Sequence, residues 1–161
     1  MHPAWRDLRG QLPENPDGRR YRNRELSDVR YLTVHHSAVD VDSTAIEVAN
    51  YHIKHEGFPG IGYHFLIHWD GTIDYVGDIL TMRYNVAGLN DKVVGVCLLG
   101  DFTGHWPTAA QLESARELLA WLKAILPATE IRSHYEIALP GYGTACSGLS
   151  YREWKGKLNG N

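Results

Sequence analysis

The chain has 161 residues, of which 43% are hydrophobic and 22% are charged, and only two are cysteines. This length suits a single domain with one core, and this composition excludes a disordered chain or a disulfide scaffold. The formal charge of −3 gives no basic surface for nucleic acid, and no apolar run approaches the roughly 20 residues that span a bilayer. We therefore expect a soluble globular monomer that neither binds nucleic acid nor inserts into a membrane.

Residues 1–30 are rich in Arg, Pro, Asn and Asp and show little periodicity. We expect them to form a mostly irregular extension with one short helix around Trp5–Leu12, followed by a folded domain at residues 31–161. The first 18 residues are polar and have no apolar stretch typical of a signal peptide. These features predict a protein made in the cytoplasm, which would need separate means of release to act outside the cell.

The rest of the chain predicts strands mixed with helices. Tyr31–His35 is a short β-branched and aromatic run, typical of a strand. Thr44 and Glu47 form a capping box that starts a helix ending at Gly57, with Ile46, Ala49 and Ile53 expected on its buried face. Similar patterns predict strands at 62–68, 72–76, 93–99 and 129–133 and helices at 108–126 and 151–158. The turn at Asp70-Gly71 predicts a hairpin, and the apolar run 93–99 predicts a central strand. The expected fold is α/β, a sheet with helices packed on it.

Two histidines and a cysteine lie at the ends of predicted elements. His35 ends the first strand, His134 follows the strand at 129–133, and Cys146 lies in the next loop. The ends of central strands meet in one sheet, and two imidazoles with a thiolate suit Zn²⁺ with an open fourth position. His36 competes with His35, but successive strand residues face opposite ways, so only one can point at the site.

Other residues have both a functional and a structural interpretation. Tyr63 is a candidate hydrogen-bond donor to an oxyanion or a half-buried strand aromatic, and Cys97 in its apolar strand is a buried hydrophobe rather than a nucleophile. The rival enzyme class is a cysteine hydrolase, with Cys146 attacking and His134 or His35 as base. That interpretation leaves one histidine without a role, and no Asn or Asp is obviously placed to orient the base.

Several motifs in one order resemble a known family. They are Val34-His35-His36-Ser37-Ala38, Gly62-Tyr63-His64-Phe65, Asp70-Gly71-Thr72, Val94–Gly100, Pro107–Gln111, Ser133–Glu136 and Ala145-Cys146. Together they resemble the zinc N-acetylmuramoyl-L-alanine amidases of type 2, which include amidase-type phage lysozymes and animal peptidoglycan recognition proteins. The resemblance covers roughly residues 31–155.

The resemblance implies a mixed central sheet flanked by helices, like that of peptidoglycan recognition proteins, with zinc at the bottom of a groove. It places His35, His134 and Cys146 on the ligand positions and Tyr63 on the active-site tyrosine. The implied activity is cleavage of the amide between muramic acid and L-alanine in peptidoglycan, as in a phage or prophage endolysin. A non-catalytic peptidoglycan-binding module and a cytoplasmic recycling amidase are the alternatives.

Three departures from the family pattern concern the site. Thr144 stands where phage enzymes often have a lysine, so we predict a weaker catalytic helper there. The loop between His134 and Cys146 is about four residues longer than usual, and serine rather than proline follows Cys146. Asn85 stands where many members have a histidine. We predict substrate contacts for Asn85 and for His36 and His64, which lie within the motifs.

Overall fold

Six strands form one sheet in the order β1-β4-β3-β5-β2-β6. In this computed structural model, which describes residues 1–159, the strands are β1 (Arg6–Asp7), β2 (Tyr31–His36), β3 (Phe65–Ile67), β4 (Ile73–Tyr75), β5 (Val93–Leu98) and β6 (Glu130–Ser133). The β3–β4 hairpin is antiparallel, and all other neighbours are parallel. The sheet is mixed, as predicted, and β5 is a central strand with every residue buried.

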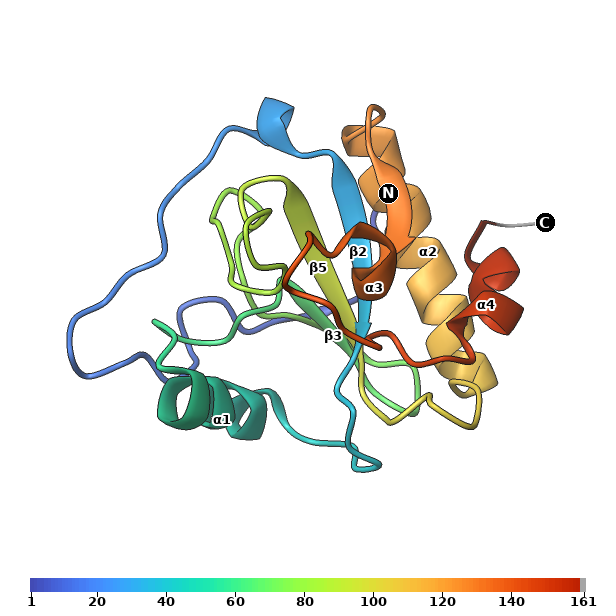
Figure 1. Cartoon of the computed structure of the whole chain (residues 1–161), viewed down its shortest axis with the longest axis horizontal. Coiled ribbons are helices and arrows are strands. Elements are labelled where there is room, and N and C mark those ends of the chain that lie inside the picture. The colour runs from blue at the N-terminus through green and yellow to red at the C-terminus, as the bar shows by residue number, and fades with distance from the viewer. Residues whose placement is uncertain (160–161) are drawn as a thin grey trace.

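Helices cover both faces of the sheet (Figure 1). They are α1 (Ala45–Glu56), α2 (Ala109–Ile125), α3 (His134–Ile137) and α4 (Tyr151–Trp154), with 3₁₀ turns η1 (Leu26–Asp28) and η2 (Lys155–Asn159). Thr44 and Thr108 form the predicted capping boxes of α1 and α2. The larger core lies between the sheet, α2 and α4, and a smaller core lies under α1. None of the helices within residues 1–159 is long and apolar enough to cross a membrane.

The predicted buried face of α1 is confirmed at Ala49 and wrong at Ile46, while Ile53 is half-buried. Ala45 and Ala49 are buried against the sheet, whereas Ile46 is exposed. Ala45 and Ala49 share the smaller core with Leu66 and Cys97 of the sheet, and Ile46 lies off that face of the helix. The predicted helix at Trp5–Leu12 is also wrong, because Arg6 and Asp7 pair as a strand with Asp74 and Tyr75 of β4.

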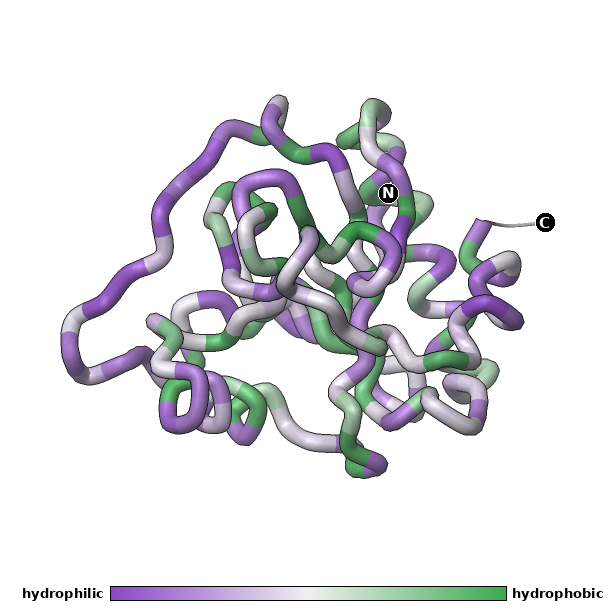
Figure 2. The backbone as a smooth tube through the Cα atoms, viewed as in Figure 1, coloured by the Kyte–Doolittle hydropathy of each residue, from purple (hydrophilic) through white to green (hydrophobic). Residues whose placement is uncertain are grey.

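The N-terminal segment passes around the outside of the domain as a largely hydrophilic arc before it enters β2 (Figure 2). Arg24 and Val29 are buried within it, and Arg24 is the charged one of the two. The Arg24 guanidinium donates to the carbonyls of Ile79 at 2.9 Å and Val93 at 2.5 Å and lies 3.2 Å from the His64 ring. Burial lowers the pKa of Arg24 to about 10, so the side chain stays charged at neutral pH. These bonds anchor the arc to the sheet.

A second anchor is a charge network at the start of the chain. Arg6 donates to both carboxylate oxygens of the buried Asp74, at 2.6 and 2.9 Å. His68 lies between Asp74 and Asp42, with one ring nitrogen 2.9 Å from each carboxylate. Only the imidazolium can donate to both, so the hydrogen bond to Asp74 raises the pKa of His68 against the opposing effect of burial.

Replacing His68 with glutamine is expected to destabilise the protein by about 1–2 kcal/mol at pH 5.5 and by less at pH 8.5. A raised pKa means that the stabilisation is fully present below the ordinary pKa of histidine and disappears as the pH rises through the raised value. The lowered pKa of Asp74 affects stability only at more acidic pH, below the two pH values being compared. Urea unfolding of both proteins at the two pH values measures the difference, and an equal loss at both would contradict a charged His68.

Candidate metal centre

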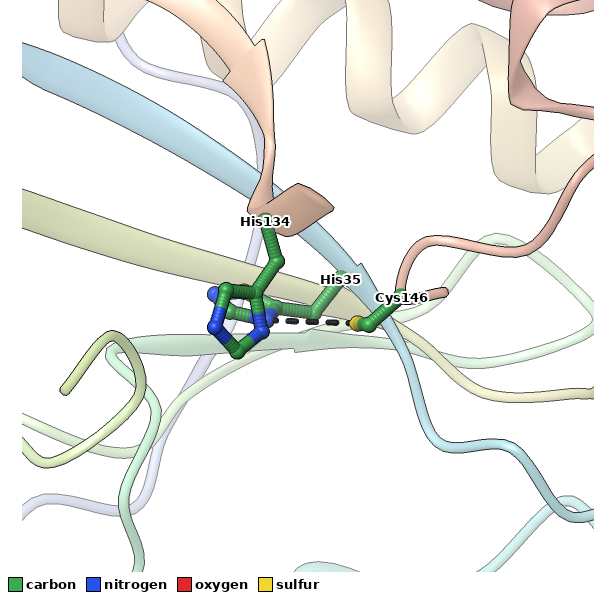
Figure 3. A group of neighbouring side chains, drawn as sticks. All are labelled: His35, His134 and Cys146. Atoms are coloured by element: carbon green, nitrogen blue, oxygen red, sulfur yellow. Dashed lines mark hydrogen bonds between the residues drawn. The ribbon is translucent and has the colours of Figure 1, made fainter. Parts of the chain in front are cut away.

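Three side chains from separate elements converge at one end of the sheet (Figure 3). His35 comes from β2, His134 is the first residue of α3, and Cys146 lies in the loop that follows. One ligand atom from each lies within 4.8 Å of the other two. The Cys146 Sγ is 3.5 Å from the His35 Nδ1, close to the roughly 3.6 Å separating sulfur and nitrogen ligands of a tetrahedral zinc. The predicted cluster is therefore present in the fold.

The protonation of the two histidines suits metal binding. Burial, helped by the nearby His134, lowers the pKa of His35 well below its ordinary value. Burial also lowers the pKa of His134. Both rings are therefore neutral near pH 7, the form that coordinates a metal. The rings lie edge to face with centroids 4.9 Å apart.

Burial raises the pKa of the Cys146 thiol to about 12. Without a cation this sulfur would stay protonated, whereas a zinc ion deprotonates a coordinating thiol outright. Neutral imidazoles beside a sulfur that needs a cation form a donor set that fits Zn²⁺ in chemistry as well as in distance.

Backbone contacts hold the last two residues of the cluster in place. Ser133 and Glu136 form a capping box that starts α3 at His134. The backbone amide of Tyr135 donates to the carbonyl of Cys146 at 2.7 Å. On the other side of the loop, the Ser147 hydroxyl donates to the carbonyl of Val34. The loop is thus attached both to α3 and to β2.

The alternation along β2 decides between its two histidines. His35 lies beside Cys97 of β5, on the α1 side of the sheet, and points at the cluster. His36 points to the opposite face, where its Nδ1 accepts from the amide of Phe102 at 3.1 Å. His64 is fully buried, and its Nδ1 accepts from the amide of Gly95 at 3.0 Å. Both rings are buried and hydrogen-bonded within the protein, and the substrate contacts predicted for His36 and His64 stay predictions.

Tyr63 lies next to the cluster, with its ring centroid 5.2 Å from that of His35. Burial raises the pKa of the Tyr63 phenol well above its ordinary value, so the hydroxyl keeps its proton and can donate it in a hydrogen bond. Thr144 is half-buried in the loop, and its Oγ1 accepts from the amide of Cys146 at 3.1 Å. The Thr144 hydroxyl proton remains available for another acceptor.

His52 is a site neighbour that the sequence analysis missed. Its ring on α1 lies 5.3 Å from the Tyr63 ring between centroids, and its Nδ1 accepts from the amide of Gly62 at 2.9 Å. Burial lowers the pKa of His52 to about 4, so the ring is neutral at pH 7. Its place near the site could have been inferred from its position about one helical turn after Ala49, on the buried face of α1.

Asn85 lies against the metal cluster. Its Oδ1 is 3.1 Å from the His35 Nε2, and its Nδ2 donates to the carbonyl of Gly62 at 2.9 Å. Asn85 is therefore placed to orient His35, and the expectation that no Asn takes this place is wrong. Residues 50 positions apart meet here because β2 and β5 are neighbours and the segment before β5 folds over them.

Comparison with known proteins agrees with this geometry. The family described as N-acetylmuramoyl-L-alanine amidase matches residues 25–149. The endolysin of Escherichia phage T7 is 32% identical over 141 residues, which cover 83% of this chain and 89% of the phage protein. An endolysin N-acetylmuramoyl-L-alanine amidase from Clostridium intestinale has a similar structure, with a TM-score of 0.79, 25% identity and coverage of 99% and 97%. The Drosophila peptidoglycan recognition protein SA shares the fold, with a TM-score of 0.75, 22% identity and coverage of 94% and 91%.

The fold and the matched residues define a peptidoglycan amidase-like α/β protein. The chain belongs to the N-acetylmuramoyl-L-alanine amidase family of type 2. Within that family, endolysins are among its relatives both in sequence and in structure.

Proposed function

We propose that this protein is a zinc-dependent endolysin that hydrolyses the amide bond between N-acetylmuramic acid and L-alanine in peptidoglycan. The observation that carries the proposal is the convergence of His35, His134 and Cys146 within 4.8 Å in a chain of the amidase family. The similarity to phage endolysins supports a lytic role on the cell wall, after release from the cell that makes the protein. Peptidoglycan is the proposed partner.

The three ligands would leave the fourth corner of a tetrahedral zinc for water or substrate. When bound, the ion would polarise the scissile carbonyl and lower the pKa of a water molecule to about 7. The chain itself supplies the remaining stabilisation. The Tyr63 hydroxyl, which burial keeps protonated, donates to the carbonyl oxygen as that oxygen gains negative charge during attack. Thr144 would be a second donor, and a weaker one than the lysine that phage enzymes often have there, because its hydroxyl carries no positive charge.

The cysteine-hydrolase alternative has one observation in its favour. Cys146, His35 and Asn85 form a chain of contacts of 3.5 and 3.1 Å, which resembles a Cys-His-Asn triad. Burial raises the pKa of the thiol to about 12, however, so the sulfur would be a poor nucleophile without a cation. His134 would also have no role. We therefore favour the metal hydrolase.

Metal removal distinguishes these candidates. We expect the purified protein to contain about one zinc per chain and to release new L-alanine N-termini from sacculi. Dialysis against a strong chelator should abolish this release, and equimolar Zn²⁺ should restore it. Chelator-resistant release that an alkylating reagent stops would favour the cysteine hydrolase. Binding to sacculi without any release, with zinc present, would instead indicate a non-catalytic peptidoglycan-binding module.

A further inference from the structure

Asn85 lies behind His35, on the side of the ring away from Cys146. The side-chain amide has a fixed orientation, because its Nδ2 donates to the carbonyl of Gly62 and its Oδ1 therefore faces His35. An amide oxygen can only accept a hydrogen bond, so the His35 Nε2 must carry the proton. The lone pair of His35 is then on Nδ1, the atom that lies 3.5 Å from the Cys146 sulfur.

The surroundings hold this amide firmly. The Asn90 Oδ1 accepts from the backbone amides of both Asn85 and Val86, each at 2.9 Å, which stiffens the turn before β5. Gly95 of β5 provides the space, because a Cβ at that position would lie 2.7 Å from three atoms of the Asn85 side chain. The glycine is thus required by the close approach of the amide to the strand.

The same amide also reaches the residue before Tyr63. Gly62 is held from two sides, by Asn85 at its carbonyl and by His52 at its amide. A single side chain therefore connects a metal ligand to the backbone that carries the candidate oxyanion donor.

We propose that Asn85 is a positioning residue with two roles. It selects the tautomer of His35 that presents Nδ1 to the metal, and it holds the Gly62–Tyr63 backbone against His35. The inference rests on the proposed zinc site and replaces the substrate contact predicted for Asn85. Hydrogen bonds to the far nitrogen of a ligating histidine are the usual means of fixing its orientation, and their loss typically costs about 10- to 100-fold in metal affinity.

Two substitutions separate the two halves of this role. Asn85→Leu removes both hydrogen bonds with little change in volume, and it should weaken zinc binding about 10- to 100-fold. Asn85→Asp keeps an acceptor for His35 but loses the donor to Gly62. It should bind zinc within about threefold of the wild type and lose turnover without a matching rise in KM. Zinc affinity is measured by competition with a chromophoric chelator, independently of catalysis.

The tautomer itself can be observed in the metal-free wild type, so the inference does not depend on the folding of any variant. Long-range proton–nitrogen correlation NMR of the His35 ring should show protonated Nε2 and unprotonated Nδ1. The opposite tautomer, or wild-type zinc affinity in a folded Asn85→Leu protein, would overturn the inference. Failure of the wild type to bind zinc would instead refute the proposed function and would leave the tautomer measurement as an independent test.

Discussion

Replacing Cys146 with serine is expected to weaken zinc binding by more than about a hundredfold and to reduce peptidoglycan hydrolysis by at least about 10² to 10³-fold. Serine is similar in size, but its hydroxyl does not ionise near neutral pH and is a poor ligand for zinc. Only two imidazoles would then hold the ion. Because one oxyanion donor alone is worth about 10² to 10³ in rate, loss of the ion should cost at least as much.

The second cysteine provides the matched control for this substitution. Cys97 is fully buried in β5 beside His35, as the sequence analysis predicted, and it is not among the clustered ligands. Cys97→Ser should therefore retain about one zinc per chain even if it unfolds at a lower temperature. Metal analysis of both variants, with turbidity loss of sacculi, makes the comparison. Equal zinc content in the Cys146→Ser protein and the wild type would remove Cys146 from the ligand set.

Elements with strong local signals could be predicted from the sequence. The capping boxes at Thr44 and Thr108 and the turn at Asp70-Gly71 each satisfy backbone groups within four residues, so their effect does not depend on the rest of the fold. Alternation along a strand indicated that only one of His35 and His36 can face the cluster, and the family resemblance implied that it is His35. Helix α3 was missed, although Ser133 and Glu136 have the spacing of a capping box.

Contacts between distant segments could not be predicted in this way. The pairing of Arg6 with Asp74 joins residues 68 positions apart, and nothing near Arg6 indicates a strand. The role of Asn85 depends on a glycine at position 95 and on a strand that begins at residue 31. On α1, the predicted face joined Ala49 to Ile46, whereas the structure buries Ala49 with Ala45, exposes Ile46 and brings His52 beside Tyr63. Such outcomes depend on the packing between elements, which a local pattern does not describe.

The second large effect concerns the Tyr63 hydroxyl. Tyr63→Phe removes one oxygen and leaves the ring in contact with the smaller core and beside His35 and His52. We expect kcat to fall about 10² to 10³-fold, because the hydroxyl interacts more strongly with the oxygen of the transition state than with the ground-state carbonyl. KM and zinc content should change little, since the three proposed ligands, His35, His134 and Cys146, are all retained.

The measurement is the rate of release of L-alanine N-termini from sacculi at several substrate concentrations, which separates kcat from KM. Tyr151→Phe is the matched control, because Tyr151 is a buried tyrosine in the core on the other side of the sheet. Its kcat should stay within about twofold of the wild type, since it loses a hydroxyl far from the reacting atoms.

An unchanged kcat in Tyr63→Phe would exclude Tyr63 from the chemistry. A rise in KM alone would make it a substrate-binding residue. A large fall in kcat with normal zinc content would assign transition-state stabilisation to the phenol hydroxyl. Loss of the metal could not then explain the lower rate.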